Sequence, residues 1–261
     1  RLFDHAMREG KKLYKEHEDT IQGCTKKVKP GDVCTLIYTS GTTGKPKGAM
    51  LTHNNICSNV KAATHHIYWD DKDTFLSFLP LCHSFERTAG YYACISCGAE
   101  IYYAESVDTV SRNLPEVKPT VVISVPRLFE KIFNVINKNV EEGSAFKQKI
   151  FKWALNTGQK YVDGKRGLVS IQKSIADKLV FDKLKEKTGG RVRLFVSGGA
   201  ALPPDIDTFF QCAGLPILQG YGLTETSPVM TANRPGDLMV GMVGTVIPGV
   251  TVGIQSLEKG E

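Results

Sequence analysis

Short runs of β-branched and aromatic residues recur along the chain, with helical patterns between several of them. Two segments, 129–138 and 171–187, space their apolar residues three or four positions apart with lysines between, which predicts amphipathic helices. Such alternation of strands and helices is typical of an α/β fold with a mostly parallel sheet covered by helices. Six runs predict strands: CTLIYTS (34–40), TFLSFLPL (74–81), EIYYAES (100–106), TVVISVP (120–126), VRLFVSGG (192–199) and LPILQGYG (215–222).

The C-terminal segment has a different pattern. PGVTVGIQSL (248–257) alternates apolar and other residues with period two and follows glycine-rich turns, which predicts a more antiparallel, β-rich appendage. We therefore expect residues 1–247 to belong to one large domain and residues 248–261 to begin a β-rich subdomain. The chain starts at Arg1 rather than Met and stops at Glu261 as a turn begins, so we expect both ends to be cut from a longer protein.

Composition narrows the class of protein. The 261 residues are 41% hydrophobic and 23% charged, which suits a globular protein, and no apolar run is long enough to predict a transmembrane span. Seven cysteines are scattered without the spacing of a disulfide framework, and this favours a reducing compartment. We expect a cytoplasmic protein.

The net charge of +6 is unevenly distributed. Segment 131–193 holds 15 Lys and Arg against 6 Asp and Glu, a local charge of +9, which leaves −3 for the rest of the chain. We favour solvated helix faces as the explanation, and a surface that attracts anionic lipid or a polyphosphate ligand remains the alternative. Aromatic residues do not interleave with the basic ones as nucleic-acid binding would require, so no nucleic-acid partner is expected.

The stretch YTSGTTGKPKG (38–48) follows the first predicted strand and is typical of an anion-binding loop. Its glycines let backbone N–H groups converge on an anion, its hydroxyls donate further hydrogen bonds, and its lysines supply positive charge, so phosphate is the expected ligand. The loop is not a Walker A motif, because Pro46 and Ala49 stand where the second glycine would have to be. A solvent-exposed hairpin would explain the glycines but not the hydroxyls and lysines together.

Three further stretches predict the rest of a nucleotide site. SGGAALPPD (197–205) and QGYGLTETSP (219–228) end predicted parallel strands, where such folds bind ligands, and LPLCHSFER (79–87) sets His83 after a third. Gly198 and Gly199 would let a flat ring approach the backbone. An aromatic ring (Tyr221), a hydroxyl (Thr224) and a carboxylate (Glu225) suit the base, phosphate and Mg²⁺ of one magnesium nucleotide.

In this order, YTSGTTGKPKG, LPLCHSFE, SGGAAL and YGLTETSP resemble the adenylate-forming superfamily of acyl-CoA synthetases, luciferases and peptide-synthetase adenylation domains. VPRLFEKIF (125–133), the basic helical insert and DKLVFDKLKEKTGGRVRLFVSGGAAL (177–202) resemble the long-chain fatty acyl-CoA synthetases. The resemblance implies that residues 1–247 are the central part of the AMP-binding large domain. The N-terminal part of that domain and the small C-terminal catalytic domain would be absent, so we expect the chain by itself to turn over poorly or not at all.

The resemblance also implies an acid–thiol ligase that uses ATP, Mg²⁺ and coenzyme A. A fatty carboxylate would attack the α-phosphorus of ATP to give acyl-AMP and pyrophosphate, and the coenzyme A thiol would then displace AMP. Two alternatives remain: a fatty acyl-AMP ligase that loads a carrier protein, and a non-catalytic nucleotide-binding module. Because long-chain substrates reside in bilayers, peripheral membrane contact is a further expectation.

Roles for individual residues follow from the resemblance. Thr224 would donate to the α-phosphate, Glu225 would hold Mg²⁺, and His83 would stand near the carboxylate and the thioester channel. Tyr221, with Gly222 leaving its face open, would stack on adenine. The adenine would be bordered by Gly198, Gly199 and Ala200, and the pyrophosphate by Thr39, Ser40, Gly41, Thr42, Thr43, Gly44 and Lys45, with Lys47 a weaker candidate.

Each of these residues has a simpler interpretation. His83 could be a hydrogen-bonded core histidine, Tyr221 could only pack, and Glu225 could be an exposed carboxylate at a helix start. Cys94 and Cys97 form a C-x-x-C without a second pair at zinc spacing, so we interpret them as small core residues. His65 and His66 lack neighbours with ligand spacing, and no metal is assigned to them.

Overall fold

A seven-stranded sheet forms the centre of the computed structural model, which describes residues 2–39 and 44–255. Its strand order is β4-β3-β5-β6-β7-β8-β9, and the neighbours from β4 to β7 run parallel while β8 and β9 run antiparallel. The predicted α/β fold with a mostly parallel sheet is confirmed. The strands are β3 (Thr74–Ser77), β4 (Glu100–Tyr103), β5 (Val121–Ser124), β6 (Leu194–Ser197), β7 (Ile217–Gly222), β8 (Val229–Ala232) and β9 (Thr245–Val246).

The predicted strand at 34–40 forms, but outside this sheet. It is β1 (Val33–Thr39), which pairs antiparallel with β2 (Lys47–Thr52) in a separate two-stranded sheet. The physical reason is the short connection, since a parallel partner would require a crossover of a dozen or more residues. The loop that we interpreted as a phosphate site therefore joins the two strands of a hairpin.

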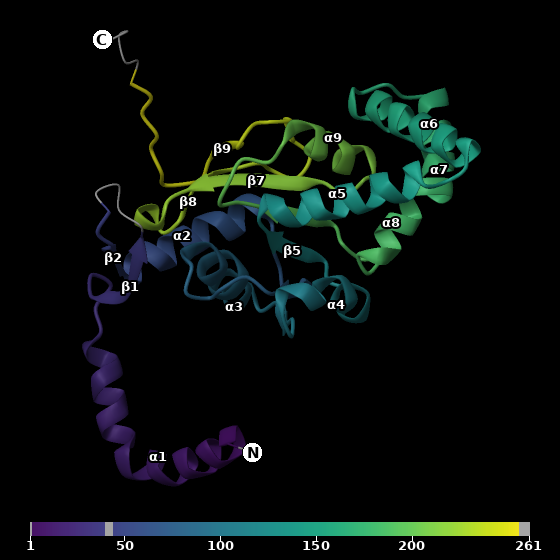
Figure 1. Ribbon diagram of the computed structural model, residues 1–261. Coiled ribbons are helices and arrows are strands. Elements are labelled where there is room, and N and C mark those ends of the chain that lie inside the picture. The colour runs from purple at the N-terminus through teal and green to yellow at the C-terminus, as the bar shows by residue number, and fades with distance from the viewer. Residues whose placement is uncertain (1, 40–43, 256–261) are drawn as a thin grey trace.

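Helices cover both faces of the large sheet (Figure 1). On one face α4 (Val110–Val117), α5 (Pro126–Glu141), α6 (Ala145–Val162), α8 (Asp182–Lys187) and α9 (Pro204–Cys212) enclose a core rich in phenylalanine. Edge-to-face contacts between the rings of Phe129, Phe195 and Phe210, with centroids 5.4–5.9 Å apart, join α5, β6 and α9. The predicted helix 129–138 lies within α5, and the predicted segment 171–187 lies within the consecutive helices α7 (Leu168–Ala176), η3 (Asp177–Phe181) and α8.

The opposite face is covered by α2 (His53–Ile67), the π-helix η1 (Glu86–Tyr92) and α3 (Ala93–Cys97). A capping box starts α2, because the Thr52 hydroxyl accepts from the Asn55 backbone N–H at 3.1 Å and the Asn55 side chain accepts from the Thr52 N–H. Cys94 is fully buried in α3, which agrees with its interpretation as a core residue, and burial raises the pKa of its thiol.

A buried carboxylate ties the start of the sheet together. Asp73, which precedes β3, accepts hydrogen bonds from Thr120 Oγ1 at 2.6 Å and from Arg193 Nε at 2.8 Å. Burial by itself would raise the pKa of Asp73, but the hydrogen bonds from Arg193 and Thr120 outweigh it and hold that pKa below its usual value. The starts of β3, β5 and β6 are thereby joined.

The two ends of the described chain extend from this body. Helix α1 (Leu2–Lys27) buries none of its residues and leads away from the sheet (Figure 1). No strand forms at 248–255, so the period-two strand predicted there is not found in the described residues, where no partner strand pairs with it. The boundary between residues 1–247 and 248–261 stays a prediction. None of the described helices is long and apolar enough to cross a bilayer.

Candidate functional site

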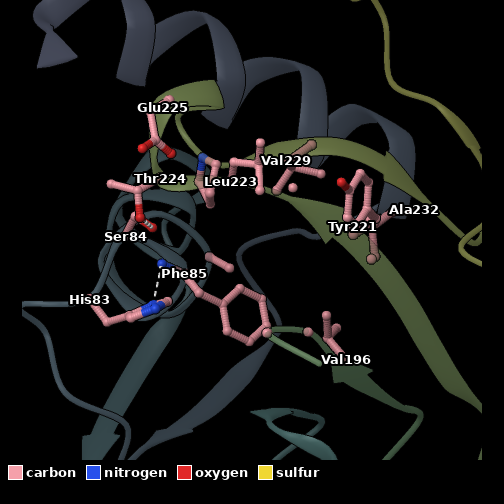
Figure 2. A pocket seen from close by; sticks show the side chains of 18 of the residues that line it. His83, Ser84, Phe85, Val196, Tyr221, Leu223, Thr224, Glu225, Val229 and Ala232 are labelled. Carbon is pink, nitrogen blue, oxygen red and sulfur yellow. Dashed lines mark hydrogen bonds between the residues drawn. The ribbon is translucent and has the colours of Figure 1, made fainter. Parts of the chain in front are cut away.

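The carboxyl ends of β6 and β7 meet the segment after β3 at a cleft of about 340 Å³ (Figure 2). This is the edge of a parallel sheet where α/β folds bind ligands, because the strand ends and the following loops leave a crevice there. The cleft collects most of the predicted residues that fall within the described part of the chain. Those lining it are Thr39, His83, Gly198, Gly199, Tyr221, Gly222, Thr224 and Glu225.

The phosphate loop is only partly described. Ser40, Gly41, Thr42 and Thr43 lie outside the described residues. Thr39 reaches the cleft, whereas Gly44, Lys45, Lys47 and Ala200 are exposed and do not line it. Lys47 pairs with Thr39 across the hairpin, and the Thr39 hydroxyl donates to the Lys47 carbonyl at 3.4 Å.

His83 lies on the exposed turn between β3 and η1, so it is not a buried core histidine. Its Nδ1 accepts the backbone N–H of Phe85 at 3.2 Å, a bond that Figure 2 draws, and this leaves Nε2 as the nitrogen that carries the proton of a neutral ring. The histidine that is buried is His66 of α2, whose Nε2 lies 2.9 Å from the Ala232 carbonyl. Burial lowers the pKa of His66.

Thr224 and Glu225 lie on η4 (Thr224–Thr226), the short 3-10 turn that follows β7. Thr224 Oγ1 is 3.2 Å from Ser84 Oγ, so the two hydroxyls link the turn to the start of η1 on the other side of the cleft. Glu225 is exposed at the cleft edge, beyond Thr224 in Figure 2. Both side chains are accessible to a ligand.

The β7 end of the cleft is formed by Tyr221 and Gly222. Tyr221 lines the cleft and is 50% exposed, so its side chain is accessible to a ligand. At Gly222 a side chain would overlap the Pro228 carbonyl oxygen, and the close approach of these two backbone segments therefore requires glycine. Asn59 of α2 binds the start of β8, next to Pro228. Its Nδ2 donates to the Val229 carbonyl at 2.7 Å, and its Oδ1 accepts from the Val229 N–H at 3.2 Å.

Phe85 is a cleft residue that the sequence interpretation missed. Gly198 was expected to leave room for a ligand ring, but the ring that lies against it is that of Phe85, and a Cβ at position 198 would come within 2.8 Å of Phe85 Cζ. Figure 2 shows the Phe85 ring projecting between His83 and Val196. Phe85 belongs to LPLCHSFE, so the motif itself was the signal that could have identified it.

Glu86, which follows Phe85 and begins η1, does not line the cleft and was not singled out from the sequence. The residue is 2% exposed, and its carboxylate accepts from Ser77 Oγ at 2.6 Å through Oε1 while Oε2 has no partner in the described structure. Burial raises the pKa of Glu86 to about 7, and the Ser77 hydrogen bond offsets part of that rise. Gly90 makes room for this carboxylate one turn further along η1.

Metal binding at the cleft would depend on Glu225. Within residues 2–39 and 44–255 no three His, Cys, Asp or Glu side chains cluster as metal ligands do. Magnesium that arrives with a nucleotide needs only one or two carboxylates, because substrate phosphates and water complete its shell. An exposed carboxylate beside the Thr224 hydroxyl fits that requirement.

The profile of AMP-binding enzymes matches residues 2–261 of this chain. The chain belongs to the AMP-binding enzyme family. Among curated AMP-binding relatives, long chain acyl-CoA synthetase 7, peroxisomal, of Arabidopsis thaliana is 38% identical over 228 residues, which cover 86% of this chain and 32% of the relative. Long-chain-fatty-acid–CoA ligase FadD15 of Mycobacterium tuberculosis is 37% identical, with 84% of this chain and 37% of the relative covered. The chain thus spans about a third of the length of these relatives.

Solved AMP-binding structures share the fold. A malonyl-CoA ligase in a ternary product complex matches with a TM-score of 0.62 and 24% identity over 89% of this chain and 42% of its own. An anthranilate CoA ligase in complex with anthranoyl-AMP matches with a TM-score of 0.57 and 21% identity over 84% and 35%. The family profile and the curated relatives confirm the resemblance to the adenylate-forming superfamily and, within it, to the long-chain acyl-CoA synthetases.

Proposed function

We propose that the protein carrying this chain is a long-chain fatty acid–CoA ligase that activates a fatty carboxylate with Mg·ATP. The observation that carries the proposal is the convergence on one cleft, at the carboxyl edge of the sheet, of His83 from the turn after β3, Tyr221 from β7, and Thr224 and Glu225 from η4. The long-chain acyl-CoA synthetases among the relatives supply the substrate class.

The first step forms the bond between a carboxylate oxygen and the α-phosphorus, and breaks the bond from the α-phosphorus to the oxygen that bridges to the β-phosphate. Pyrophosphate leaves with that electron pair. Because two anions must meet, the protein contributes mainly position and charge neutralisation. In the second step the thiol sulfur of coenzyme A attacks the acyl carbonyl carbon, loses its proton, and expels AMP.

Side chains of the cleft would divide this work. Thr224, aligned by its contact with Ser84, would donate to the α-phosphate. Tyr221 would stack on adenine, and the neighbouring Gly222 would leave space for that base. Glu225 would hold Mg²⁺, which neutralises phosphate charge when bound. Gly198, Gly199 and Ala200 would border the base, and His83 would face the carboxylate. The phosphate loop 39–45, with Lys47 behind it, would hold the pyrophosphate.

The test is substitution of Thr224→Ala and Glu225→Ala in the full-length protein. Loss of one preorganised donor costs about 10²–10³ in rate, so fatty-acid-dependent pyrophosphate release by Thr224→Ala should fall by that order. Glu225→Ala removes the carboxylate proposed to hold Mg²⁺ and should also lower the rate strongly, and both variants should keep a melting temperature close to wild type. Glu141→Ala removes an exposed carboxylate at the end of α5 that does not line the cleft, and serves as the matched control. Normal turnover by both cleft variants would refute the assignments.

Separate experiments test which thiol accepts the acyl group and how long the acyl chain of the substrate is. Thioester formation with free coenzyme A supports the ligase, whereas adenylate that accumulates until a carrier protein is added would indicate the acyl-AMP ligase. If no pyrophosphate is released in response to fatty acid, the protein would instead be a non-catalytic nucleotide-binding module. Thermal shifts with non-hydrolysable palmitoyl and acetyl adenylates test the preference for a long acyl chain, because each buried methylene contributes up to about 0.8 kcal/mol.

Location in the cell is part of the same proposal. We place the reaction in the cytoplasm, with peripheral contact to a membrane that supplies the substrate. Cell fractionation, together with flotation of the full-length protein on vesicles, tests both statements.

A further inference from the structure

An apolar groove runs along α5 on the opposite face of the sheet from the cleft. One stripe of α5, spaced by three and four residues, lines it from Leu128 to Val140. The groove consists of two depressions of about 500 and 390 Å³ that share Ile136, Leu184 and Lys187. The span from 128 to 140 is 12 residues of helix, or about 18 Å, comparable to the length of an extended long acyl chain.

Helix α5 is apolar on two sides. One side is fully buried in the core, whereas the groove-side residues Leu128, Ile132, Ile136 and Val140 pack against the core but stay partly exposed. Phe129 is fully buried against Phe195 and Phe210, which accounts for the core-facing side. The groove side instead has a buried floor, which includes Leu114 and Leu184, and walls that stay open to solvent. The exposed wall residues are Val107 (62%), Val135 (52%), Phe146 (73%) and Leu179 (52%).

The groove is rimmed by positive charge. Lys131, Lys147, Lys183 and Lys187 line it, all exposed, against a single acidic residue, Asp108. In the described part of the chain none of these four lysines forms an ion pair. Part of the basic excess of segment 131–193 therefore lies around the apolar groove.

We propose that this groove binds a long-chain acyl amphiphile whose head group carries phosphate, such as a long-chain acyl thioester of coenzyme A. The apolar stripe matches one extended acyl chain, and four lysines against one carboxylate match a head group with several negative charges better than a single carboxylate. The groove is concave, whereas a helix that docks on a bilayer presents its apolar face outward. This site is distinct from the cleft of Figure 2, which opens beside α2 and η1 on the other face of the sheet.

The test is photo-crosslinking of the full-length protein with palmitoyl-CoA that carries a diazirine near the end of its acyl chain, followed by peptide mapping with mass spectrometry. We expect adducts on the peptides of α4, α5 and α8 that line the groove. Val135→Glu should reduce those adducts at least tenfold, because it puts a charge on an exposed groove wall without disturbing the core. Leu168→Glu, which changes an apolar residue of α7 that is 70% exposed and lies outside the groove, should leave them unchanged.

Competition identifies the head group. Unlabelled palmitoyl-CoA should displace the probe, and the same concentration of palmitate or of free coenzyme A should displace it at least tenfold less well. Lys131→Gln combined with Lys147→Gln should weaken labelling by palmitoyl-CoA. Three results would overturn the proposal: no adduct on the groove peptides, equal displacement by palmitate, or displacement by anionic vesicles alone, which would make a bilayer the occupant. The site does not depend on the proposed reaction, since groove adducts and pyrophosphate release are measured separately.

Discussion

A single methyl group at position 198 should test how Phe85 is positioned in the cleft. In Gly198→Ala the new Cβ would lie 2.8, 3.0 and 3.2 Å from three atoms of the Phe85 ring. Optimal carbon–carbon contacts are about 3.5–4.0 Å, so the ring must retreat by roughly 0.7 Å or more. Overpacking of this kind costs about 1–3 kcal/mol, which is the loss of unfolding free energy that we expect.

A double-mutant cycle separates this contact from other effects of the methyl group. With Phe85→Ala in the background, the space at Gly198 is free and Gly198→Ala should cost close to nothing, a coupling of about 1–3 kcal/mol. Gly199→Ala is the matched control: its φ of +81° penalises any side chain by about 1–2 kcal/mol, while its Cβ would meet only Val125 Cγ1 at 3.6 Å. Its cost should therefore be the same with or without Phe85.

The assay is chemical denaturation of the four proteins of the cycle, together with the two Gly199→Ala proteins, at one pH. A second readout is the thermal shift caused by an acyl-adenylate analogue, which should shrink in Gly198→Ala because the displaced ring enters the cleft. If Gly198→Ala costs the same in both backgrounds, the Phe85 ring does not lie against Gly198 and the reasoning is refuted.

Three other predictions concern groups that support the cleft and the sheet. Asn59→Ala should lower the unfolding free energy by about 2–4 kcal/mol in denaturant titrations, because it orphans both the N–H and the carbonyl of Val229; an unchanged midpoint would contradict this. Glu86→Gln should stabilise the protein by up to about 3 kcal/mol at pH 8 and by little at pH 4. The reason is that the pKa of Glu86 is about 7 in the folded protein and lower in the unfolded chain, so the wild-type protein loses stability as pH rises from about 4.5 to 7. Unfolding curves across that range check this sign, and a gain independent of pH would disprove the assignment. Asp73 has a lowered folded pKa, so the stability it contributes is present above its unfolded pKa and is lost as pH falls through the folded value. Asp73→Asn should therefore flatten the acid side of the stability profile measured by unfolding curves.

Much of the fold was predictable from local pattern. All six predicted strands form, and the lysine-spaced segments are helices, because period-two and period-3.6 patterns determine which face of an element can be buried. Two helix starts also have a local cause, since a proline stands at the first helical position of α5 (Pro126) and of α9 (Pro204). The candidate cleft followed from the rule that parallel strands end at one edge, and its described part contains eight of the predicted residues.

Local pattern could not predict which strands pair with each other or which distant side chains come into contact. The strand at 33–39 pairs in a hairpin rather than in the parallel sheet, and the alternation at 248–255 forms no strand, because a strand is stable only with a neighbour to bond. Phe85 fills the space beside Gly198, and Asn59 holds the turn at Val229 from 170 positions away along the chain.

The sequence by itself determined the order of the elements and the residue types that reach the cleft, since these depend on local pattern and spacing, and its four ordered motifs carried the resemblance to the family. Only the tertiary structure decided which side chain occupies which space. Burial of Glu86 and the open lysine-rimmed groove on α5 arise from packing between elements distant in sequence, and no local pattern specifies the distances of that packing.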